Sequence, residues 1–130
     1  MVYEELTQKI IGCAFKVHKV LGSGYLEKVY ENALCLELAK QQLAAQQQVP
    51  LTVYYEGQSV GDFIADIVVE SCVIVEIKAI RTLNQQHEAQ VVNYLTTTGL
   101  EIGLLINFGS SSVEIKRKYR DYKPARHTKP

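Results

Sequence analysis

The sequence predicts a single α/β (α+β) domain in which helices flank a central mixed β-sheet. Helical and strand-like periods follow one another in the order helix, helix, three strands, helix, two strands, and strands interleaved with helices pack into such a sheet. A length of 130 residues suits one domain with one core. We therefore expect one folded domain over residues 1–122, followed by a basic, mobile tail over residues 123–130.

Two helices are expected first, and both should pack on the sheet. Apolar residues recur at helical spacing over residues 4–21, and Gly22 and Gly24 end that helix. A second helical pattern runs over residues 26–47 and stops before Pro50, which cannot continue a helix.

Three strands follow the helices. Residues 49–55 alternate between apolar and polar side chains up to a turn at residues 56–58. Residues 62–79 contain two β-branched strands that fold back on each other. If this hairpin closes around Ser71, residues whose numbers sum to 142 face each other across it.

The remaining elements are a helix and two strands. Asn84 or Thr82 can cap the helix, and Gly99 marks its end. Residues 102–108 form a nearly continuous apolar run, as expected for a strand that is covered on both faces. An alternating strand over residues 113–119 completes the sheet.

The composition argues against several classes of protein. The chain is 47% hydrophobic and 22% charged, and it shows neither a signal peptide nor an apolar stretch of membrane-spanning length, so we expect a cytoplasmic protein with no membrane partner. Its three cysteines lack the spacing of metal ligands, which argues against a zinc knuckle or a disulfide framework. The sequence also lacks a glycine-rich phosphate loop and an ordered Ser/His/Asp triad.

Basic residues are concentrated at the C-terminal end of an otherwise acidic chain. From Lys116 onward there are seven lysines and arginines against one acidic residue. Such a cluster indicates contact with a polyanion, and we expect nucleic acid to bind at Lys116, Arg117, Lys118 and Arg120. The alternative from composition alone is a solvated tail that keeps the protein soluble.

The predicted hairpin carries charges where a strand normally carries apolar residues. Side chains repeat every two residues, so Glu76 and Lys78 share a face, and the expected register sets Asp66 opposite Glu76 with Cβ atoms about 5 Å apart. Two carboxylates this close repel each other unless a cation lies between them. The arrangement therefore predicts a divalent metal at Asp66 and Glu76, with Lys78 beside the attacking water.

Other interpretations of these charges are open. Glu76 and Lys78 could form an exposed ion pair on a surface strand, although the apolar residues around them favour a central strand. On the following helix, His87, Gln90 and Tyr94 are spaced by three and four residues and so share one stripe. That stripe either faces the carboxylates or forms a solvent-exposed helix side with Tyr94 half-buried.

A further carboxylate opens the second helix. Glu27 lies in its first turn, where the helix dipole favours an acidic residue in any case. Glu27 would complete a metal site if it reached Asp66 and Glu76.

These motifs resemble those of a known group of enzymes. Asp66 followed after nine residues by Glu76-Ile-Lys78 resembles the D-x(n)-E-x-K core of the PD-(D/E)XK nuclease superfamily, and Gln90-Val-Val-Asn-Tyr94 resembles the QxxxY motif of its RecB-like branch. Gly24-Tyr-Leu-Glu27-Lys-Val-Tyr30 is similar to the signature of the GxxExxY family, which is grouped with those nucleases. The similarity extends over about residues 10–118. Ala65 stands where the proline of the superfamily name would be.

The resemblance implies a restriction-endonuclease-like αβββαβ core whose central hairpin supplies the metal ligands. Asp66 and Glu76 would then bind the metal and Lys78 would be catalytic. Glu27 would be a metal-binding carboxylate supplied by a helix. Gln90 and Tyr94 would also be catalytic residues and would support the site.

The sequence therefore leads to two functional hypotheses. The first is a nuclease that depends on Mg²⁺ (or Mn²⁺) and hydrolyses phosphodiester bonds, with nucleic acid as its partner and DNA favoured over RNA. The second is a catalytically silent nucleic-acid-binding or assembly module that retains the nuclease fold. Because the chain is small, we expect a homodimer or a partner protein to supply substrate recognition.

Overall fold

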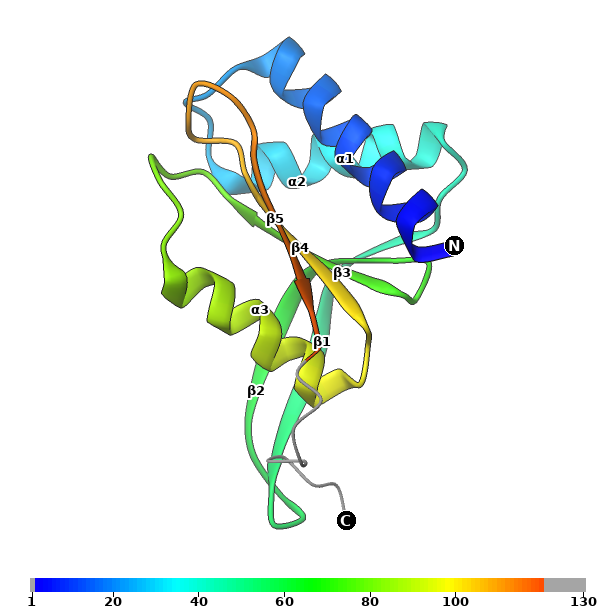
Figure 1. The fold of residues 1–130 in the computed structure, drawn as a ribbon, viewed down its shortest axis with the longest axis vertical. Coiled ribbons are helices and arrows are strands. Elements are labelled where there is room, and N and C mark those ends of the chain that lie inside the picture. Colours follow the sequence, from blue (N-terminus) through cyan, green and yellow to red (C-terminus); the bar gives the residue numbers. More distant parts are fainter. Residues whose placement is uncertain (1, 121–130) are drawn as a thin grey trace.

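The computed structural model of the protein describes residues 2–120. The elements follow the predicted order (Figure 1): α1 (Val2–Leu21), α2 (Glu27–Lys40), β1 (Ala45–Tyr55), β2 (Gln58–Val69), β3 (Val73–Lys78), α3 (Gln85–Thr98), β4 (Ile102–Asn107) and β5 (Glu114–Tyr119). The predicted tail at residues 123–130 lies outside the described residues. Over residues 2–120, no helix is both long and apolar enough to cross a membrane.

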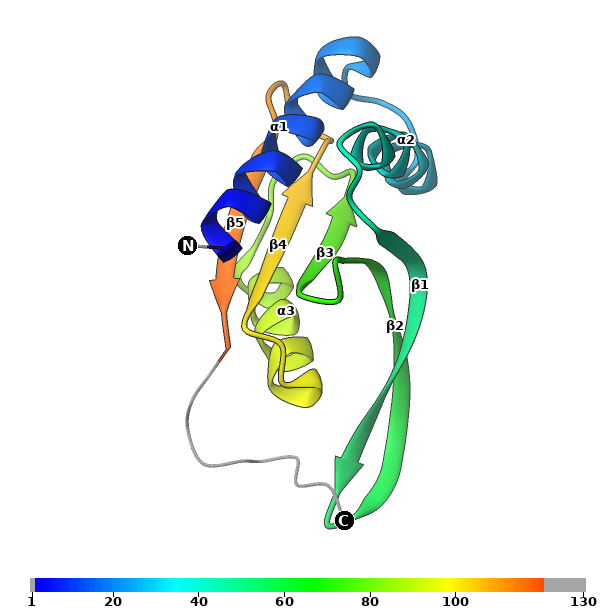
Figure 2. The same ribbon diagram turned by 90° about the vertical axis from the view of Figure 1, so that its right-hand side faces the viewer.

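The five strands form one mixed sheet in the order β1-β2-β3-β4-β5. β3 and β4 run parallel, and the other neighbouring strands are antiparallel. α1 and α2 pack on one face of the sheet and α3 packs on the other (Figure 2). The predicted fold class is therefore confirmed.

The larger apolar core lies between the sheet and the helix pair α1 and α2. Within this core the rings of Tyr30 and Phe108 stack with their centroids 4.6 Å apart. The hydroxyl of the buried Tyr30 donates a hydrogen bond of 2.6 Å to the backbone oxygen of Gly22. Tyr30 thus anchors the turn between α1 and α2 to the core, which is a structural role for this part of the Gly24–Tyr30 motif.

The caps predicted for α3 are present. The side chain of Asn84 accepts a hydrogen bond of 3.0 Å from the backbone N–H of His87, and the ring of His87 accepts one of 3.2 Å from the backbone N–H of Asn84. Gly99 ends the helix in the left-handed conformation at φ 78°, which glycine adopts without strain. His87 is therefore engaged as a capping residue.

The predicted end of the second helix is wrong. α2 ends at Lys40 rather than at residue 47, and the chain turns at Gln42, which has a positive φ of 61°. The glutamines at 46–48 belong to β1, whose residue Ala45 already pairs with Val69 of β2. Pairing with β2 has overridden the helical propensity of these glutamines.

The predicted hairpin register is correct, but regular alternation stops at Asp66. Ile67 pairs with Val75, so the paired numbers sum to 142 as predicted. Ile67 packs in the core beneath α1 and α2, whereas Ala65 packs against α3. Residues two apart on a regular strand would share a face, so the strand twists sharply between them.

The twist has a backbone cause in the neighbouring strand. Gln48 of β1 adopts a positive φ of 54°, and the β1–β2 ladder passes from the pair Gln47 and Ile67 to the pair Val49 and Ala65. Beyond this point β1 and β2 continue as a two-stranded ribbon that extends away from the sheet (Figure 2). Asp66 therefore lies where the ribbon leaves the sheet.

The buried Asn107 fixes the segment that follows β3. The side-chain oxygen of Asn107 accepts hydrogen bonds of 3.0 Å from the backbone N–H groups of Ile80 and Gly109, and its amide nitrogen donates one of 2.9 Å to Glu114. Because Ile80 follows β3 by two residues, these bonds fix the path of the chain directly after Lys78.

Candidate functional site

Asp66 and Glu76 hold β2 and β3 together beyond the end of their backbone ladder. The ladder pairs residues 67–69 with residues 73–75. One residue further, the backbone N–H of Asp66 donates a hydrogen bond of 2.9 Å to Oε2 of Glu76, and the backbone N–H of Ile77 donates one of 2.8 Å to Oδ2 of Asp66. Each carboxylate is thus fixed by the strand that carries the other.

Burial makes this pair electrostatically unfavourable. The side chain of Glu76 is 7% exposed, and burial, followed by the charge of Asp66, raises the pKa of Glu76 to about 8. Burial also raises the pKa of Asp66, although the hydrogen bond from Ile77 opposes that shift. A buried and a half-buried carboxylate that both have raised pKa values form a site where a cation is stabilising.

Lys78 supplies positive charge next to the pair. It ends β3 and is half-buried, and its ammonium group lowers the pKa of both Asp66 and Glu76. The structure therefore brings together the three hairpin charges that the sequence predicts at one place.

The predicted α2 carboxylate, Glu27, lies at the surface. Its side chain is exposed, and its charge raises the pKa of Asp66. Glu31, one turn later, is 3% exposed, and its charge raises the pKa of both Asp66 and Glu76. Glu31 is thus the α2 carboxylate whose charge acts on both Asp66 and Glu76, and it is absent from the site residues predicted from the sequence.

Glu31 is oriented by donors from three residues. Its carboxylate accepts hydrogen bonds from the side-chain amides of Gln47 at 2.8 Å and Gln48 at 3.1 Å, and from the ammonium group of Lys28 at 3.2 Å. Glu31 shares the buried side of α2 with Tyr30 and the residues that follow at helical spacing, and this pattern could have singled it out.

α3 brings a tyrosine to the site. The ring of Tyr94 stacks on Phe63 of β2 with centroids 3.7 Å apart and an interplanar angle of 13°. Burial raises the pKa of Tyr94, the charges of Glu76 and Asp66 raise it further, and a hydrogen bond with the side chain of Gln90 opposes the shift. Of the predicted stripe, Tyr94 therefore lies near the carboxylates, the exposed Gln90 contacts Tyr94, and His87 caps the helix.

Three of the predicted nucleic-acid-binding residues, Lys116, Arg117 and Lys118, lie on the edge strand β5, and Arg120 directly follows it. Arg117 donates a hydrogen bond of 3.1 Å to the hydroxyl of Thr7 on α1. Lys118 forms an ion pair of 3.0 Å with Glu88 of α3, and Arg120 forms one of 2.9 Å with Glu101. Lys116 is exposed on β5. Arg117, Lys118 and Arg120 thus contact different parts of the protein, and the role of all four residues in binding nucleic acid stays a prediction.

The chemistry of the donors fits a hard divalent cation. Asp66 and Glu76 offer carboxylate oxygens, which Mg²⁺ and Mn²⁺ prefer, and their mutual repulsion would be relieved by positive charge. Within residues 2–120, no group of three or more histidines, cysteines, aspartates and glutamates is arranged to hold a metal. The pair therefore offers two protein carboxylates to a cation rather than a closed cage of protein ligands.

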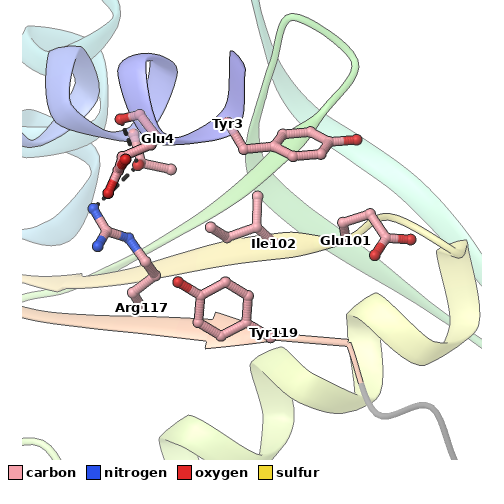
Figure 3. Close-up of a pocket in the computed structure, with 7 residues that line it drawn as sticks. Tyr3, Glu4, Glu101, Ile102, Arg117 and Tyr119 are labelled. Atoms are coloured by element: carbon pink, nitrogen blue, oxygen red, sulfur yellow. Dashed lines mark hydrogen bonds between the residues drawn. The ribbon is translucent and has the colours of Figure 1, made fainter. Parts of the chain in front are cut away.

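A separate pocket lies at the start of α1 (Figure 3). It has a volume of about 330 Å³ and is lined by residues that include Tyr3, Ile102, Arg117 and Tyr119. These residues come from α1, β4 and β5, whereas the carboxylate pair comes from β2 and β3. This pocket is therefore distinct from the candidate site.

Comparisons with known proteins agree with the fold. The family model described as the PD-(D/E)XK nuclease superfamily matches residues 4–118. The solved structure described as "Crystal structure of SSO0001" is similar over 74% of this chain and 50% of its own, with a TM-score of 0.59 and 17% sequence identity. The chain thus spans half the length of that protein, and the likeness concerns the fold alone. A comparison with curated proteins found no match.

Proposed function

Since the chain belongs to the PD-(D/E)XK nuclease superfamily, we propose that it is a metal-dependent nuclease that hydrolyses phosphodiester bonds, with DNA as its preferred substrate. The observation that carries this proposal is the pair of the half-buried Asp66 and the buried Glu76 beside Lys78, in which each carboxylate accepts a backbone hydrogen bond from the other strand. We further propose that the chain is a member of the GxxExxY family and of the branch with the QxxxY motif.

Asp66 and Glu76 are the proposed ligands of Mg²⁺ or Mn²⁺. Their carboxylates are already fixed by backbone donors, so little side-chain freedom is lost on binding. When bound, a divalent cation offsets the charge that builds on the phosphate and lowers the pKa of water.

Lys78 is proposed to orient the attacking water and to offset negative charge on the phosphate. Its influence on the pKa of both carboxylates supports this position. Gln90 and Tyr94 are proposed supports, since their hydrogen bond holds the tyrosine hydroxyl within range of the same carboxylates.

We propose Glu31 rather than Glu27 as the principal acidic support from α2. Glu31 is buried, oriented by two glutamines and coupled to both ligands, whereas Glu27 is exposed. Glu31 would hold a metal-bound water or contribute to the cation site through its charge.

The direct test is cleavage of single- and double-stranded DNA and RNA with Mg²⁺ or Mn²⁺. We expect DNA cleavage by the wild type, loss of cleavage in Lys78→Ala and Glu76→Gln, and unchanged cleavage in Lys19→Ala, which alters an exposed lysine on α1. Cleavage by Lys78→Ala at the wild-type rate would refute the proposed role of that lysine.

A DNA-binding assay at several salt concentrations, run beside the cleavage assay, separates the second hypothesis. A protein that binds DNA with steep salt dependence, is unaffected by Glu76→Gln and cleaves no nucleic acid would be a binding or assembly module that retains the fold.

A further inference from the structure

Gln48 of β1 has an unusual backbone conformation beside the candidate site. Its φ is 54°, in the left-handed region that few residues other than glycine and asparagine adopt. In the β1–β2 ladder the residue before Gln48 pairs with the residue after Asp66, and the residue after Gln48 pairs with the residue before Asp66. Gln48 therefore stands opposite a proposed metal ligand. A glutamine in this conformation is strained and persists only where the surrounding structure holds it.

The side chain of Gln48 reaches the acidic residue that α2 contributes to the site. Its amide nitrogen donates hydrogen bonds of 3.1 Å to both carboxylate oxygens of Glu31, Oε1 and Oε2. Oε2 also accepts hydrogen bonds from Gln47 at 2.8 Å and Lys28 at 3.2 Å. Within residues 2–120, Oε1 accepts a hydrogen bond from Gln48 alone. Gln48 is thus the donor that fixes both oxygens of Glu31 at once.

Glu31 needs such donors because its charge lies near two other carboxylates. Its side chain is buried, and its charge raises the pKa of Asp66 and of Glu76. Like charges that share a site repel each other, so a freely rotating Glu31 would turn away from the pair. Hydrogen bonds to a charged acceptor are stronger than those between neutral groups. The amide of Gln48 therefore opposes the repulsion that would move Glu31.

We propose that Gln48 is a positioning residue of the site, whose left-handed backbone directs its amide onto Glu31 and so holds the Glu31 carboxylate beside Asp66 and Glu76. This inference rests on the proposed function, in which Asp66 and Glu76 bind the metal and Glu31 is the acidic support from α2. Gln48 acts through Glu31 and not on the substrate. One residue thus accounts both for the turn of the β1–β2 ribbon at Asp66 and for the placement of Glu31.

Gln48→Asn separates the side-chain contact from the backbone conformation. Asparagine adopts the left-handed conformation more readily than glutamine, so the variant should fold. Its side chain is shorter by one carbon–carbon bond of about 1.5 Å. An amide that reaches Glu31 at 3.1 Å in the wild type would then fall outside hydrogen-bond distance. Gln42→Asn is the matched control, because Gln42 also has a positive φ, 61°, but is exposed in the turn after α2.

The first test measures Mn²⁺ affinity by calorimetry in the wild type, Gln48→Asn, Glu31→Gln and the double variant. We expect Gln48→Asn to weaken binding by several-fold, up to about tenfold, and Gln42→Asn to leave it unchanged. Because Gln48 acts through Glu31, the double variant should bind no more weakly than Glu31→Gln alone. Additive losses in the double variant, or wild-type affinity in Gln48→Asn, would overturn the proposal.

The second test measures cleavage of DNA at saturating Mn²⁺, with melting temperatures to check the fold of each variant. Gln48→Asn should lower kcat and leave KM for DNA unchanged, since Gln48 contacts Glu31 and not DNA. A lower melting temperature with unchanged kcat would assign Gln48 to stability alone and overturn the proposal.

The affinity measurement also distinguishes this proposal from the proposed function. Mn²⁺ binding without cleavage by the wild type would contradict the proposed nuclease, while the comparison of affinities would still decide the role of Gln48. A wild type that binds no Mn²⁺ would contradict the metal site and the role of Gln48 together. Equal Mn²⁺ binding by the wild type and Gln48→Asn would contradict the role of Gln48 alone.

Discussion

Asp66 and Glu76 each accept a hydrogen bond from the backbone of the strand that carries the other, at 2.8 and 2.9 Å. These bonds replace the ladder between β2 and β3 at the point where the β1–β2 ribbon leaves the sheet. The two carboxylates thereby serve the fold and the candidate site together. The negative charges of the two carboxylates repel each other, whereas their hydrogen bonds hold β2 and β3 together. Protonation or a bound cation should therefore strongly change the stability of this pair.

The stability of the metal-free protein should fall as the pH rises from about 5 to about 8. The pKa of Glu76 is about 8 in the folded protein and 4.5 is its ordinary value, so the folded state binds this proton more tightly. The stabilisation that this proton provides is complete below the ordinary pKa of Glu76. It is lost as the pH rises through the pKa of Glu76 in the folded protein, by on the order of 4 kcal/mol. Urea unfolding in a chelating buffer at pH 5, 7 and 8.5 measures the change.

Glu76→Gln should remove most of this dependence and should be more stable than the wild type at pH 8.5. Glutamine cannot ionise, so the repulsion with Asp66 is lost while an acceptor for the N–H of Asp66 remains. Glu56→Gln, in an exposed turn, is the control and should follow the wild type. If Glu76→Gln lost stability with pH as steeply as the wild type, Glu76 would not be the titrating group.

Removing the charge of Glu31 should weaken Mn²⁺ binding more than removing that of Glu27. Glu31 is buried and acts on both Asp66 and Glu76, whereas Glu27 is exposed and acts on Asp66. Loss of an outer carboxylate of this kind costs about tenfold or more in metal affinity. Calorimetric titration of Glu31→Gln and Glu27→Gln compares them, and a larger loss in Glu27→Gln would favour the assignment made from the sequence motif.

Phe63→Ala should reduce both stability and cleavage. The stack of Phe63 and Tyr94 joins the β1–β2 ribbon to α3, and an aromatic pair of this kind contributes about 1 kcal/mol beyond its buried area. Without Phe63 the hydroxyl of Tyr94 would lose its fixed position. Tyr55→Ala removes an aromatic ring that is 57% exposed and should change neither quantity. Equal cleavage rates in Phe63→Ala and the wild type would mean that the stack of Phe63 and Tyr94 does not contribute to cleavage.

The basic residues of β5 should differ in their effect on DNA binding. Lys116→Ala should lower DNA affinity and reduce the slope of log affinity against log salt by about one, since Lys116 is exposed. Arg117→Ala should instead lower stability by about 1 kcal/mol, because Arg117 donates to Thr7. Fluorescence anisotropy at several salt concentrations, with thermal melts, measures both. An unchanged salt slope in Lys116→Ala would assign that lysine to solubility.

The fold was largely predictable from periodicity. The helices, the strands and the register of Ile67 with Val75 follow from residue spacing and from a short turn near Ser71. The end of α2 was not predictable in the same way. Glutamine favours helix weakly, and the pairing of β1 with β2 decided the structure of residues 46–48.

The candidate site was predicted in part. Asp66, Glu76 and Lys78 follow from the hairpin, and Tyr94 follows from the helical stripe that faces them. The burial of Glu31 and the turn of β2 at Asp66 depend on tertiary contacts with Gln47 and Gln48, which local patterns do not specify.

Calorimetric titration of Mn²⁺ into wild type and Asp66→Asn at pH 8 tests whether Asp66 and Glu76 bind a divalent metal. We expect saturable binding to the wild type and loss of that binding in Asp66→Asn, because the substitution removes one of two ligand charges while keeping the size of the side chain. Equal binding to the two proteins, or no binding to the wild type, would contradict the assignment of Asp66 and Glu76 as a metal site.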